Sequence, residues 1–350
     1  MTLRENVPLG PLTTLQVGGP ALYLVEAVSP DDVREAVSFA SDRKLPLFIL
    51  GGGSNLVVSD SGWPGLVLRI TIPGVKEPAP GLFEAGAGCD WDRFVVHAVE
   101  QDCAGIECLS GIPGKVGGTP IQNVGAYGQE VSTTIVSVHV FDRDTGEFRD
   151  FSNAECGFGY RASNFNRDPT GRFVVLRVTY QLNPRGAPCL DYADLKEHFG
   201  ERASPPSLGE VREAVCEIRR RKGMLLDPAD ADSRSAGSFF KNPIIAQAHY
   251  EHLAAEYEMP KWWAGLNRTK LSAAWLVENA GFPKGYTRGT VGISTKHALA
   301  IVNRGGATAQ DVIALRDKIV ARVEERFGVV LVQEPVFLGE FTAESHATKP

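Results

Sequence analysis

The sequence predicts an α+β protein with a two-part N-terminal unit and a C-terminal domain that begins after about residue 205. Predicted strands and helices alternate through the first third of the chain, and a strand-rich stretch follows between Thr133 and Tyr180. The segment Ser204-Pro205-Pro206-Ser207 is typical of a linker. Beyond it the composition changes, because three of the five tryptophans lie between residues 262 and 275.

The first helix is predicted to begin after Ser29, whose hydroxyl can cap the exposed backbone N–H groups. Pro30 suits a first helical turn, and the acidic pair that follows it complements the positive end of the helix dipole. Leu47–Leu50 then has the pattern of a buried strand that ends in glycines, and Leu56–Val58 is the next predicted strand.

A second helix is predicted over residues 90–101, and two runs rich in β-branched residues, 136–140 and 173–178, are predicted strands. After the linker, Ser207 and Glu210 form a capping box, in which each side chain can accept from the other residue's backbone N–H. This box predicts the start of a further helix.

The end of the chain contains the clearest amphipathic pattern. Residues 308–327 place apolar side chains on one face, and Gly328 is typical of a helix C-cap. A final strand is predicted over Val329–Leu338 and contains one acid, Glu334. A lone carboxylate in an apolar strand either faces solvent or serves a function.

Composition limits the kind of protein. Hydrophobic residues make up 43% and charged residues 22%, which is ordinary for a soluble globular protein. The net charge of −6 argues against a nucleic-acid-binding protein. One basic run, Arg219-Arg220-Arg221-Lys222, favours either a solvated helix end or a local anion site.

The six cysteines show neither a C-x-x-C pair nor zinc-type spacing, so we expect buried thiols in a reducing compartment. The N-terminus lacks a signal peptide, and no apolar stretch approaches the ~20 residues that cross a bilayer. These features predict a cytoplasmic protein without membrane insertion. His249 and His252 have helical spacing but no third ligand, so no metal site is predicted.

Gly51-Gly52-Gly53-Ser54-Asn55 lies between two predicted strands. A Rossmann fingerprint would open a helix, and a P-loop would end in Gly-Lys-Ser/Thr, so both motifs are excluded. Three glycines still allow backbone N–H groups to converge on an anion. A tight hairpin turn explains this segment equally well.

A second glycine-rich segment favours a cofactor site. Seven glycines lie between Gly105 and Gly128, interleaved with prolines and polar side chains. A loop of this length in a compact domain is usually functional, although an irregular surface loop is the alternative. Its polar groups suit a large, flat, hydrogen-bonding cofactor.

The stretch Gly237-Ser-Phe-Phe-Lys-Asn-Pro243 combines a hydroxyl, two aromatic rings, a cation and an amide in seven residues. A core strand does not require this mixture, whereas a site that grips a polar ligand and transfers a proton does. By itself Ser238 is more simply explained as a turn-forming serine.

Five motifs in order resemble the UDP-N-acetylenolpyruvoylglucosamine reductase (MurB) family. They are Gly51–Asn55, Gly111-Ile112-Pro113-Gly114, Gln122-Asn123-Val124-Gly125-Ala126-Tyr127-Gly128, Tyr160-Arg161 and Gly237–Pro243. The resemblance runs from about Leu15 to Leu338. It implies a two-lobed FAD-binding domain of the vanillyl-alcohol-oxidase type over residues 15–204, with lobes of about 15–68 and 69–204. A C-terminal α+β substrate-binding domain over 205–340 would follow, with strand 329–338 returning to the flavin site.

The resemblance also implies which residues bind a dissociable FAD. Gly51 to Asn55 would hold the pyrophosphate, and the second glycine-rich segment would hold the adenosine and flavin portions. The implied cofactor-binding residues are Gly51, Gly52, Gly53, Ser54, Asn55, Ser110, Gly111, Ile112, Pro113, Gly114, Gly117, Gly118, Thr119, Gln122, Asn123, Gly125, Ala126, Tyr127, Gly128, Val174 and Arg219.

The family's reaction reduces the enolpyruvyl ether of UDP-N-acetylglucosamine to UDP-N-acetylmuramate, with NADPH as reductant. In this chain Arg161 would bind the substrate carboxylate, Glu334 would stabilise the enol and Ser238 would donate the proton. Because a serine hydroxyl is a weak acid, Ser238 needs nearby cations or a proton relay.

The implied substrate contacts are Tyr160, Tyr192, Lys222, Asn242, Lys284 and His297. Tyr192 places the chain in the longer subfamily, where a tyrosine loop folds over the diphosphate. For His297, a uracil-side contact and a solvent-facing position are equally acceptable. The implied partner is a small nucleotide-sugar substrate, and we expect a monomer or a weak oligomer.

Two segments depart from patterns seen in some members. The chain after Lys222 is two residues longer, and Val336 stands where some members have an arginine. Two other functions fit the glycine segments: a flavin oxidase of the same fold, or a non-catalytic flavin or nucleotide-sugar sensor. Neither gives Ser238, Arg161 and Glu334 a joint purpose.

Overall fold

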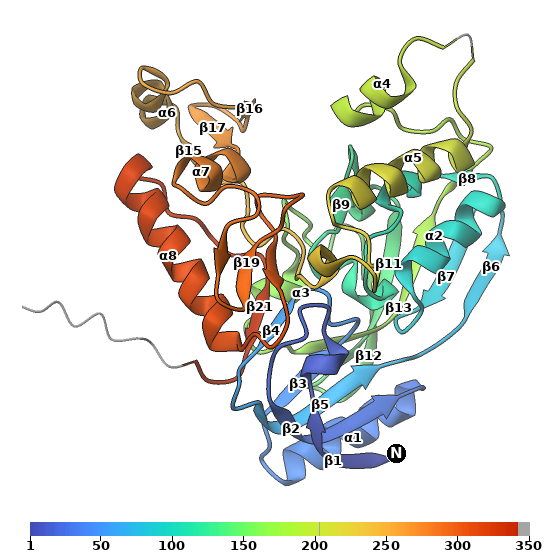
Figure 1. Ribbon diagram of the computed structural model, residues 1–350. Helices are drawn as coiled ribbons and strands as arrows, with labels where there is room; N and C mark the ends of the chain where they lie inside the picture. Colours follow the sequence, from blue (N-terminus) through green and yellow to red (C-terminus); the bar gives the residue numbers. More distant parts are fainter. Residues whose placement is uncertain (203, 342–350) are drawn as a thin grey trace, which may run out of the picture. The chain divides into compact units, whose positions relative to one another are not determined.

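The computed structural model describes residues 1–202 and 204–341. The chain folds into two compact α+β units, which are described separately (Figure 1). The first contains Met1–Val7, Ala21–Gly53 and Pro64–Leu225, and the second contains Pro8–Pro20, Ser54–Trp63 and the chain from Leu226 onward. The units are therefore interleaved in sequence rather than being consecutive halves of the chain.

The first unit begins with a four-stranded sheet in the order β1-β2-β5-β3, against which helix α1 packs (Figure 1). The N-cap predicted at Ser29 is confirmed, because its hydroxyl accepts from the backbone N–H of Asp32 at 3.2 Å, and Asp32 completes a capping box. The elements are β1 (Leu3–Pro8), β2 (Pro20–Ala27), α1 (Pro30–Asp42), β3 (Leu47–Leu50) and β5 (Trp63–Ile70).

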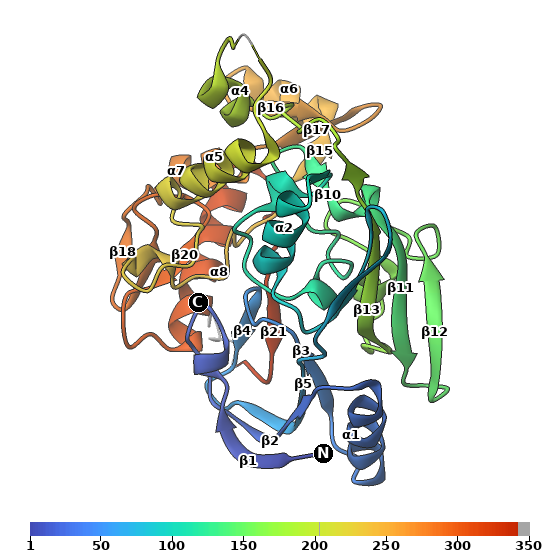
Figure 2. The same cartoon turned by 90° about the vertical axis from the view of Figure 1, so that its right-hand side faces the viewer.

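A five-stranded antiparallel sheet forms the centre of this unit, in the order β12-β11-β13-β7-β6. Figure 2 shows β11, β12 and β13 side by side. Helix α2 packs on the sheet through Phe94, whose ring lies 5.1 Å from that of Tyr180. The elements are β6 (Val75–Ala79), β7 (Leu82–Gly86), α2 (Trp91–Glu100), β11 (Ile135–Asp142), β12 (Glu147–Ser152) and β13 (Phe173–Gln181).

The glycine-rich connection between α2 and β11 has little regular structure but is not a surface loop. Ile106, Cys108, Leu109 and Val116 are fully buried, which excludes the irregular surface loop considered above. Its short elements are β8 (Cys103–Ala104), η2 (Glu107–Leu109), η3 (Val116–Gly118), β9 (Gly125–Ala126), β10 (Gln129–Glu130) and η4 (Val131–Thr133). β8 pairs with β14 (Asn183–Pro184), and α3 spans Asn164–Arg167.

Helix α5 (Leu208–Arg221) begins at the predicted capping box of Ser207 and Glu210. It belongs to the first unit, where Arg212 forms two hydrogen bonds of 2.7 and 2.8 Å with Asp92 of α2. The short helix α4 (Ala193–Phe199) precedes it and carries Tyr192 at its N-cap. The bidentate pair holds the N-terminal half of α5 beside α2.

The second unit has three small sheets and a long helix. The strand orders of these sheets are β15-β17-β16, β18-β19-β20 and β21-β4. Helix α8 (Ala309–Phe327) buries Val312, Leu315, Ile319 and Val323 completely and ends at Gly328 with φ 64°, as predicted. The remaining elements are η1 (Gly10–Leu12), β4 (Leu56–Val58), η5 (Ala231–Ser233), β15 (Ile244–Ala246), α6 (Gln247–Ala254), β16 (Lys261–Trp263), β17 (Arg268–Leu271), α7 (Ala273–Asn279), β18 (Thr287–Arg288), β19 (Val291–Ile293), β20 (Ile301–Asn303) and β21 (Val336–Leu338).

The last strand is shorter than the predicted Val329–Leu338. Only β21 is a regular strand, and it pairs in parallel with β4. Before it, Gln333 forms an isolated bridge to Phe240. The segment changes partner around Pro335, which has no backbone N–H for a continuous ladder, so two short pairings replace one strand.

Within residues 1–202 and 204–341, no helix is long and apolar enough to cross a membrane. The same residues contain no cluster of three or more His, Cys, Asp or Glu side chains suited to a metal ion. All six cysteines are free thiols, of which Cys103, Cys108 and Cys156 are buried.

The buried carboxylate of Asp142 predicts a pH-dependent stability. Arg172 binds it at 2.7 and 2.6 Å, and this hydrogen bonding lowers the pKa of Asp142 to about 2. Because the folded pKa lies below the unfolded value of 3.8, the pair stabilises fully above about pH 4 and loses its effect as the pH falls through 2. Asp142→Asn should lower the free energy of unfolding by about 2 kcal/mol at pH 7 and remove this slope, measured by urea unfolding between pH 2 and 7.

The matched control is Asp144→Asn, which removes an exposed carboxylate 3.2 Å from the same Arg172. An exposed pair contributes at most about 1 kcal/mol. Equal losses in the two variants would contradict the assignment of the stabilisation to Asp142.

Candidate active site

The first glycine segment is not a hairpin turn. β3, which precedes it, pairs with β5, and β4, which follows it, pairs with β21. Among the described strands β3 and β4 do not pair with each other, so the hairpin alternative is wrong. Gly53 has φ 66°, a conformation that favours glycine.

The two glycine segments of the first unit touch through their backbones. A Cβ atom added to Gly52 would lie 2.7 Å from the Cα of Gly114, so a side chain at position 52 would force the segments apart. At Gly51 and Gly118 an added Cβ would meet no atom of the described residues within 4 Å. The segments thus approach closely at one point and leave open space beside it.

Polar side chains from α2 and β13 form hydrogen bonds with the second glycine segment. Asp92 accepts from the backbone N–H of Gly111 at 2.6 Å, and the hydroxyls of Thr119 and Tyr180 lie 2.7 Å apart. Ser110 and Thr119 are buried and hydrogen bonded within the loop, and the side chain of Val174 is buried in β13. At these three predicted positions, a bound cofactor would therefore meet backbone atoms.

Arg219 carries the strongest sign of a ligand-binding site in this unit. Its side chain is 6% exposed, and one guanidinium N–H donates to the carbonyl of Met224 at 2.7 Å. Its buried Nε has no hydrogen-bond partner among the described residues. Burial lowers the pKa of Arg219, and the hydroxyl of Tyr127 opposes this shift.

A buried guanidinium with an open donor favours an acceptor from a bound molecule. An added Cβ on Gly111 would lie 3.4 Å from the Arg219 Nε, so this donor borders the second glycine segment. The residues present therefore fit a large cofactor with hydrogen-bond acceptors, as predicted for FAD.

Arg161 lies directly on the second glycine segment. Its guanidinium donates to the carbonyl of Gly125 at 2.8 Å, and its φ of 52° is unusual for a residue with a side chain. Asn123, which is fully buried, donates to the carbonyl of Gly159 at 3.1 Å and thereby fixes the turn before Arg161. Such a strained, supported residue is typical of functional sites.

The predicted substrate contacts of the first unit also lie together. The Tyr192 ring packs edge-on against Tyr127, with centroids 5.3 Å apart. The ammonium of Lys222 forms an ion pair with Asp194, in the first turn of α4 after Tyr192. Burial opposes the charge of Lys222, but the hydrogen bond to Asp194 prevails and raises the pKa of the lysine. Tyr160 is 42% exposed, beside Arg161.

In the second unit, two chain segments flank Ser238. The backbone N–H of Phe239 donates to the carbonyl of Leu299 at 2.8 Å, and that of Glu334 donates to the carbonyl of Phe239 at 2.9 Å. The hydroxyl of Ser238 lies 3.0 Å from the Nε2 of His297. The structure thus brings together the side chains of Ser238 and His297 and places the backbone of Glu334 beside Phe239, and His297 does not simply face solvent.

The remaining predicted residues have varied surroundings. The Asn55 side-chain amide donates to the carbonyl of Glu334 at 3.2 Å. Asn242 accepts from the backbone N–H of Ala273 at 3.0 Å at the start of α7, whereas Lys284 is exposed. Of the three predicted catalytic residues, Arg161 belongs to the first unit, and Ser238 and Glu334 belong to the second.

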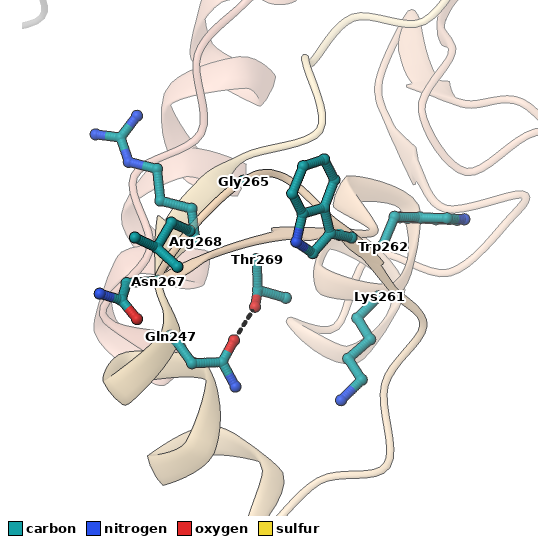
Figure 3. Close-up of a pocket in the computed structure, with 9 residues that line it drawn as sticks. Gln247, Lys261, Trp262, Gly265, Asn267, Arg268 and Thr269 are labelled. Carbon is teal, nitrogen blue, oxygen red and sulfur yellow. Dashed lines mark hydrogen bonds between the residues drawn. The ribbon is translucent and has the colours of Figure 1, made fainter.

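One pocket was not predicted. It has a volume of about 350 Å³ and lies in the second unit beside β16, β17 and α6 (Figure 3). Trp262 lines it and is 48% exposed, with Lys261 and Arg268 among the other lining residues. The adjacent tryptophans between these two cations were a usable signal, but in the sequence they marked only a change of composition.

The chain matches two family models. One describes an FAD binding domain over residues 21–152, and the other describes the C-terminal domain of UDP-N-acetylenolpyruvoylglucosamine reductase over residues 227–338.

Full-length relatives give the same result. The UDP-N-acetylenolpyruvoylglucosamine reductase of Streptomyces avermitilis is 48% identical over 347 residues, which cover 96% of this chain and 94% of that protein. The corresponding protein of Thermobifida fusca is 46% identical over 350 residues, covering 96% and 98%. The crystal structure of UDP-N-acetylenolpyruvylglucosamine reductase (MurB) from Thermus caldophilus aligns with a TM-score of 0.68 and 29% identity, covering 97% of this chain and 100% of that one.

The contact between Gly52 and Gly114 predicts that a side chain at position 52 weakens FAD binding, whereas a methyl group added at a glycine away from this contact does not. Gly52→Ala should weaken FAD binding about 10- to 100-fold, because overpacking costs about 1–3 kcal/mol and displaces the segment at Gly114. Gly209→Ala in α5 is the matched control, because its added Cβ would meet only the Ser207 hydroxyl oxygen at an ordinary 3.8 Å; it should change the affinity less than about threefold. Titration of the apoproteins with FAD measures both, and equal dissociation constants would contradict the proposed contact.

Proposed function

Because this chain belongs to the UDP-N-acetylenolpyruvoylglucosamine reductase family and is an FAD-dependent oxidoreductase, we propose that it reduces UDP-N-acetylglucosamine enolpyruvate to UDP-N-acetylmuramate, with NADPH as reductant. The observation that best supports this assignment is the 3.0 Å contact of the Ser238 hydroxyl with His297, on a segment whose next residue, Phe239, bonds to the backbone of Glu334. This arrangement supplies a proton donor with polar support. The reaction serves the synthesis of peptidoglycan precursors, for which we retain the predicted cytoplasmic location.

The glycine segments and Arg219 are the proposed holders of FAD. Gly51 to Gly53 and Gly111 to Gly114 bring bare backbone to one place, and Arg219 offers a buried donor beside Gly111. When bound, FAD supplies the hydride chemistry. Binding the substrate, stabilising its developing charge and providing the proton fall to this chain's own residues.

Arg161 is the proposed anchor of the enolpyruvyl carboxylate. A guanidinium stays charged and can bind a carboxylate through two parallel hydrogen bonds. The bond from Arg161 to the Gly125 carbonyl uses one N–H and holds the planar group in a fixed orientation. Negative charge that develops on the substrate during reduction is then stabilised without a large movement of the side chain.

Ser238 and Glu334 are the proposed pair on the proton side. Ser238 donates its hydroxyl proton to the substrate carbon next to the carboxylate. Glu334 polarises the enol from a neighbouring segment, whose backbone is fixed by the bond from its N–H to Phe239. The two side chains have complementary roles, since Ser238 donates a proton and the Glu334 carboxylate accepts a hydrogen bond.

Substrate recognition is assigned to two groups of residues. Lys222, beside Tyr192 and Tyr127, offers an ammonium that a diphosphate can take over from Asp194. The pocket lined by Trp262 has the size and lining for the nucleotide portion of the substrate. Its indole can stack on a base, and Lys261 or Arg268 can bind a phosphate.

The proposal is tested by product analysis. The purified protein with FAD is incubated with NADPH and UDP-N-acetylglucosamine enolpyruvate, and the nucleotide is examined by mass spectrometry. We expect a product two hydrogens heavier, formed in equal amount to the NADPH consumed. Oxidation of NADPH without a new nucleotide product would reject the assignment.

Removal of the proposed acid should affect only one half of the reaction. In Ser238→Ala, reduction of the bound FAD by NADPH should proceed at the wild-type rate. Its reoxidation by the enolpyruvyl substrate should slow about 10²- to 10⁴-fold, the usual loss for a general acid. Anaerobic stopped-flow absorbance measures the two rates separately, and unchanged reoxidation would remove Ser238 from the mechanism.

Arg161→Lys should lower turnover about 10-fold or more, because an ammonium is a point charge and cannot reproduce a planar two-bond clamp. Arg167→Lys is the matched control, since Arg167 also donates to a backbone carbonyl, that of Gly157 at 2.7 Å, but has no proposed contact with substrate. Steady-state rates of both variants measure the difference. Similar rates would assign the Arg161 effect to local folding instead of substrate binding.

A further inference from the structure

The hydrogen bond between Ser238 and His297 raises a question that the proposed reaction leaves open. A serine that gives its proton to carbon becomes an alkoxide, which is too basic to persist in a protein. Another group must return a proton in the same step or directly after it. The hydroxyl of Ser238 lies within hydrogen-bond distance of the Nε2 of His297, at 3.0 Å.

Both residues are held by backbone contacts. The N–H of Phe239, next to Ser238, bonds to the carbonyl of Leu299, and the backbone N–H of His297 donates to the Ser294 hydroxyl at 3.2 Å. The carbonyl of His297 accepts from the N–H of Ala300 at 3.1 Å. The two side chains are 59 positions apart in the sequence, so their approach is a property of the fold.

Charged side chains on and beside the turn that carries His297 already form ion pairs or hydrogen bonds with other residues. Lys296 forms an ion pair of 2.7 Å with Asp230. Asp232 is buried and accepts from the hydroxyl of Ser294 and from the backbone N–H of Thr295, at 3.0 and 2.8 Å. These bonds fix the turn that carries His297, while the imidazole itself is only half-buried and can exchange protons with solvent.

We propose that His297 is the proton relay of Ser238, an inference that rests on the proposed function. The Ser238 O–H bond breaks as the C–H bond forms at the substrate carbon next to the carboxylate. The Nε2–H of the protonated imidazole passes its proton to the serine oxygen. A proton from solvent then restores the imidazolium, so each turnover consumes one solvent proton and no additional oxidant or reductant.

This role differs from the two positions considered for His297 in the sequence. A contact with the uracil would act on substrate affinity, and a solvent-facing side chain would have no effect. A relay acts on the rate of proton delivery and only through Ser238. Histidine suits it, because imidazole takes up and releases protons near neutral pH.

The test is a double-mutant cycle with His297→Gln, Ser238→Ala and the double variant. The measured quantity is the anaerobic single-turnover rate of FAD reoxidation by UDP-N-acetylglucosamine enolpyruvate at saturating concentration. We expect His297→Gln to slow this rate about 10²-fold when Ser238 is present and less than about threefold when it is absent. An equal loss in both backgrounds, or a change in KM alone, would overturn the relay.

A second variant separates proton transfer from packing. His297→Ala opens space beside Ser238, and added imidazole should restore at least about a tenth of the lost rate while N-methylpyrrole should not. Failure of imidazole to restore any rate in a variant that retains FAD and its reduction by NADPH would count against the relay. If the wild-type protein itself is not reoxidised by the substrate, the proposed function fails, and the two failures are thus distinguished.

Discussion

The contact between bare backbones at Gly52 and Gly114 is the constraint on which the proposed FAD site of this protein depends. It tolerates no side chain, so it explains why two glycine-rich segments distant in sequence are both required. Asp92 and Tyr180 brace the second segment from the helix and the sheet behind it. The open donor of Arg219 then borders a surface made mainly of backbone, which is how a protein can approach a large polar cofactor closely.

The proposed reaction makes a different demand on the second unit, which is to place a weak acid beside groups that assist it. Its solution is an extended segment around Ser238 that pairs on one side with Leu299 and on the other with the chain before β21. In the proposed mechanism, proton transfer relies on backbone pairing, whereas the proposed substrate contacts include longer side chains such as Trp262 and Lys222, which are partly exposed. The fold thus holds the proposed proton donor on paired backbone and leaves the proposed substrate-binding side chains free to adjust.

Local signals in the sequence predicted the helices well, because the capping boxes at Ser29 and Ser207 and the C-cap at Gly328 act within a few residues. Pairings between distant segments could not be predicted in this way. The hairpin alternative at Gly51–Asn55 and the full length of the last strand both failed because the partners of β3, β4 and β21 lie elsewhere in the chain. Likewise, the contact of Ser238 with His297 and the pocket beside β16 and β17 arise only from the fold. The composition of the glycine motifs indicated a cofactor site, but the contact between the two segments is visible only in the folded structure.

The central claim is that one bound FAD accepts electrons from NADPH and passes them to an enolpyruvyl nucleotide with the help of these residues. An anaerobic titration followed by visible absorbance tests it most directly. The flavin bands should bleach when NADPH is added and return in full when UDP-N-acetylglucosamine enolpyruvate follows, without oxygen. Bands that bleach and return only when oxygen is admitted would contradict the account and indicate an oxidase of the same fold.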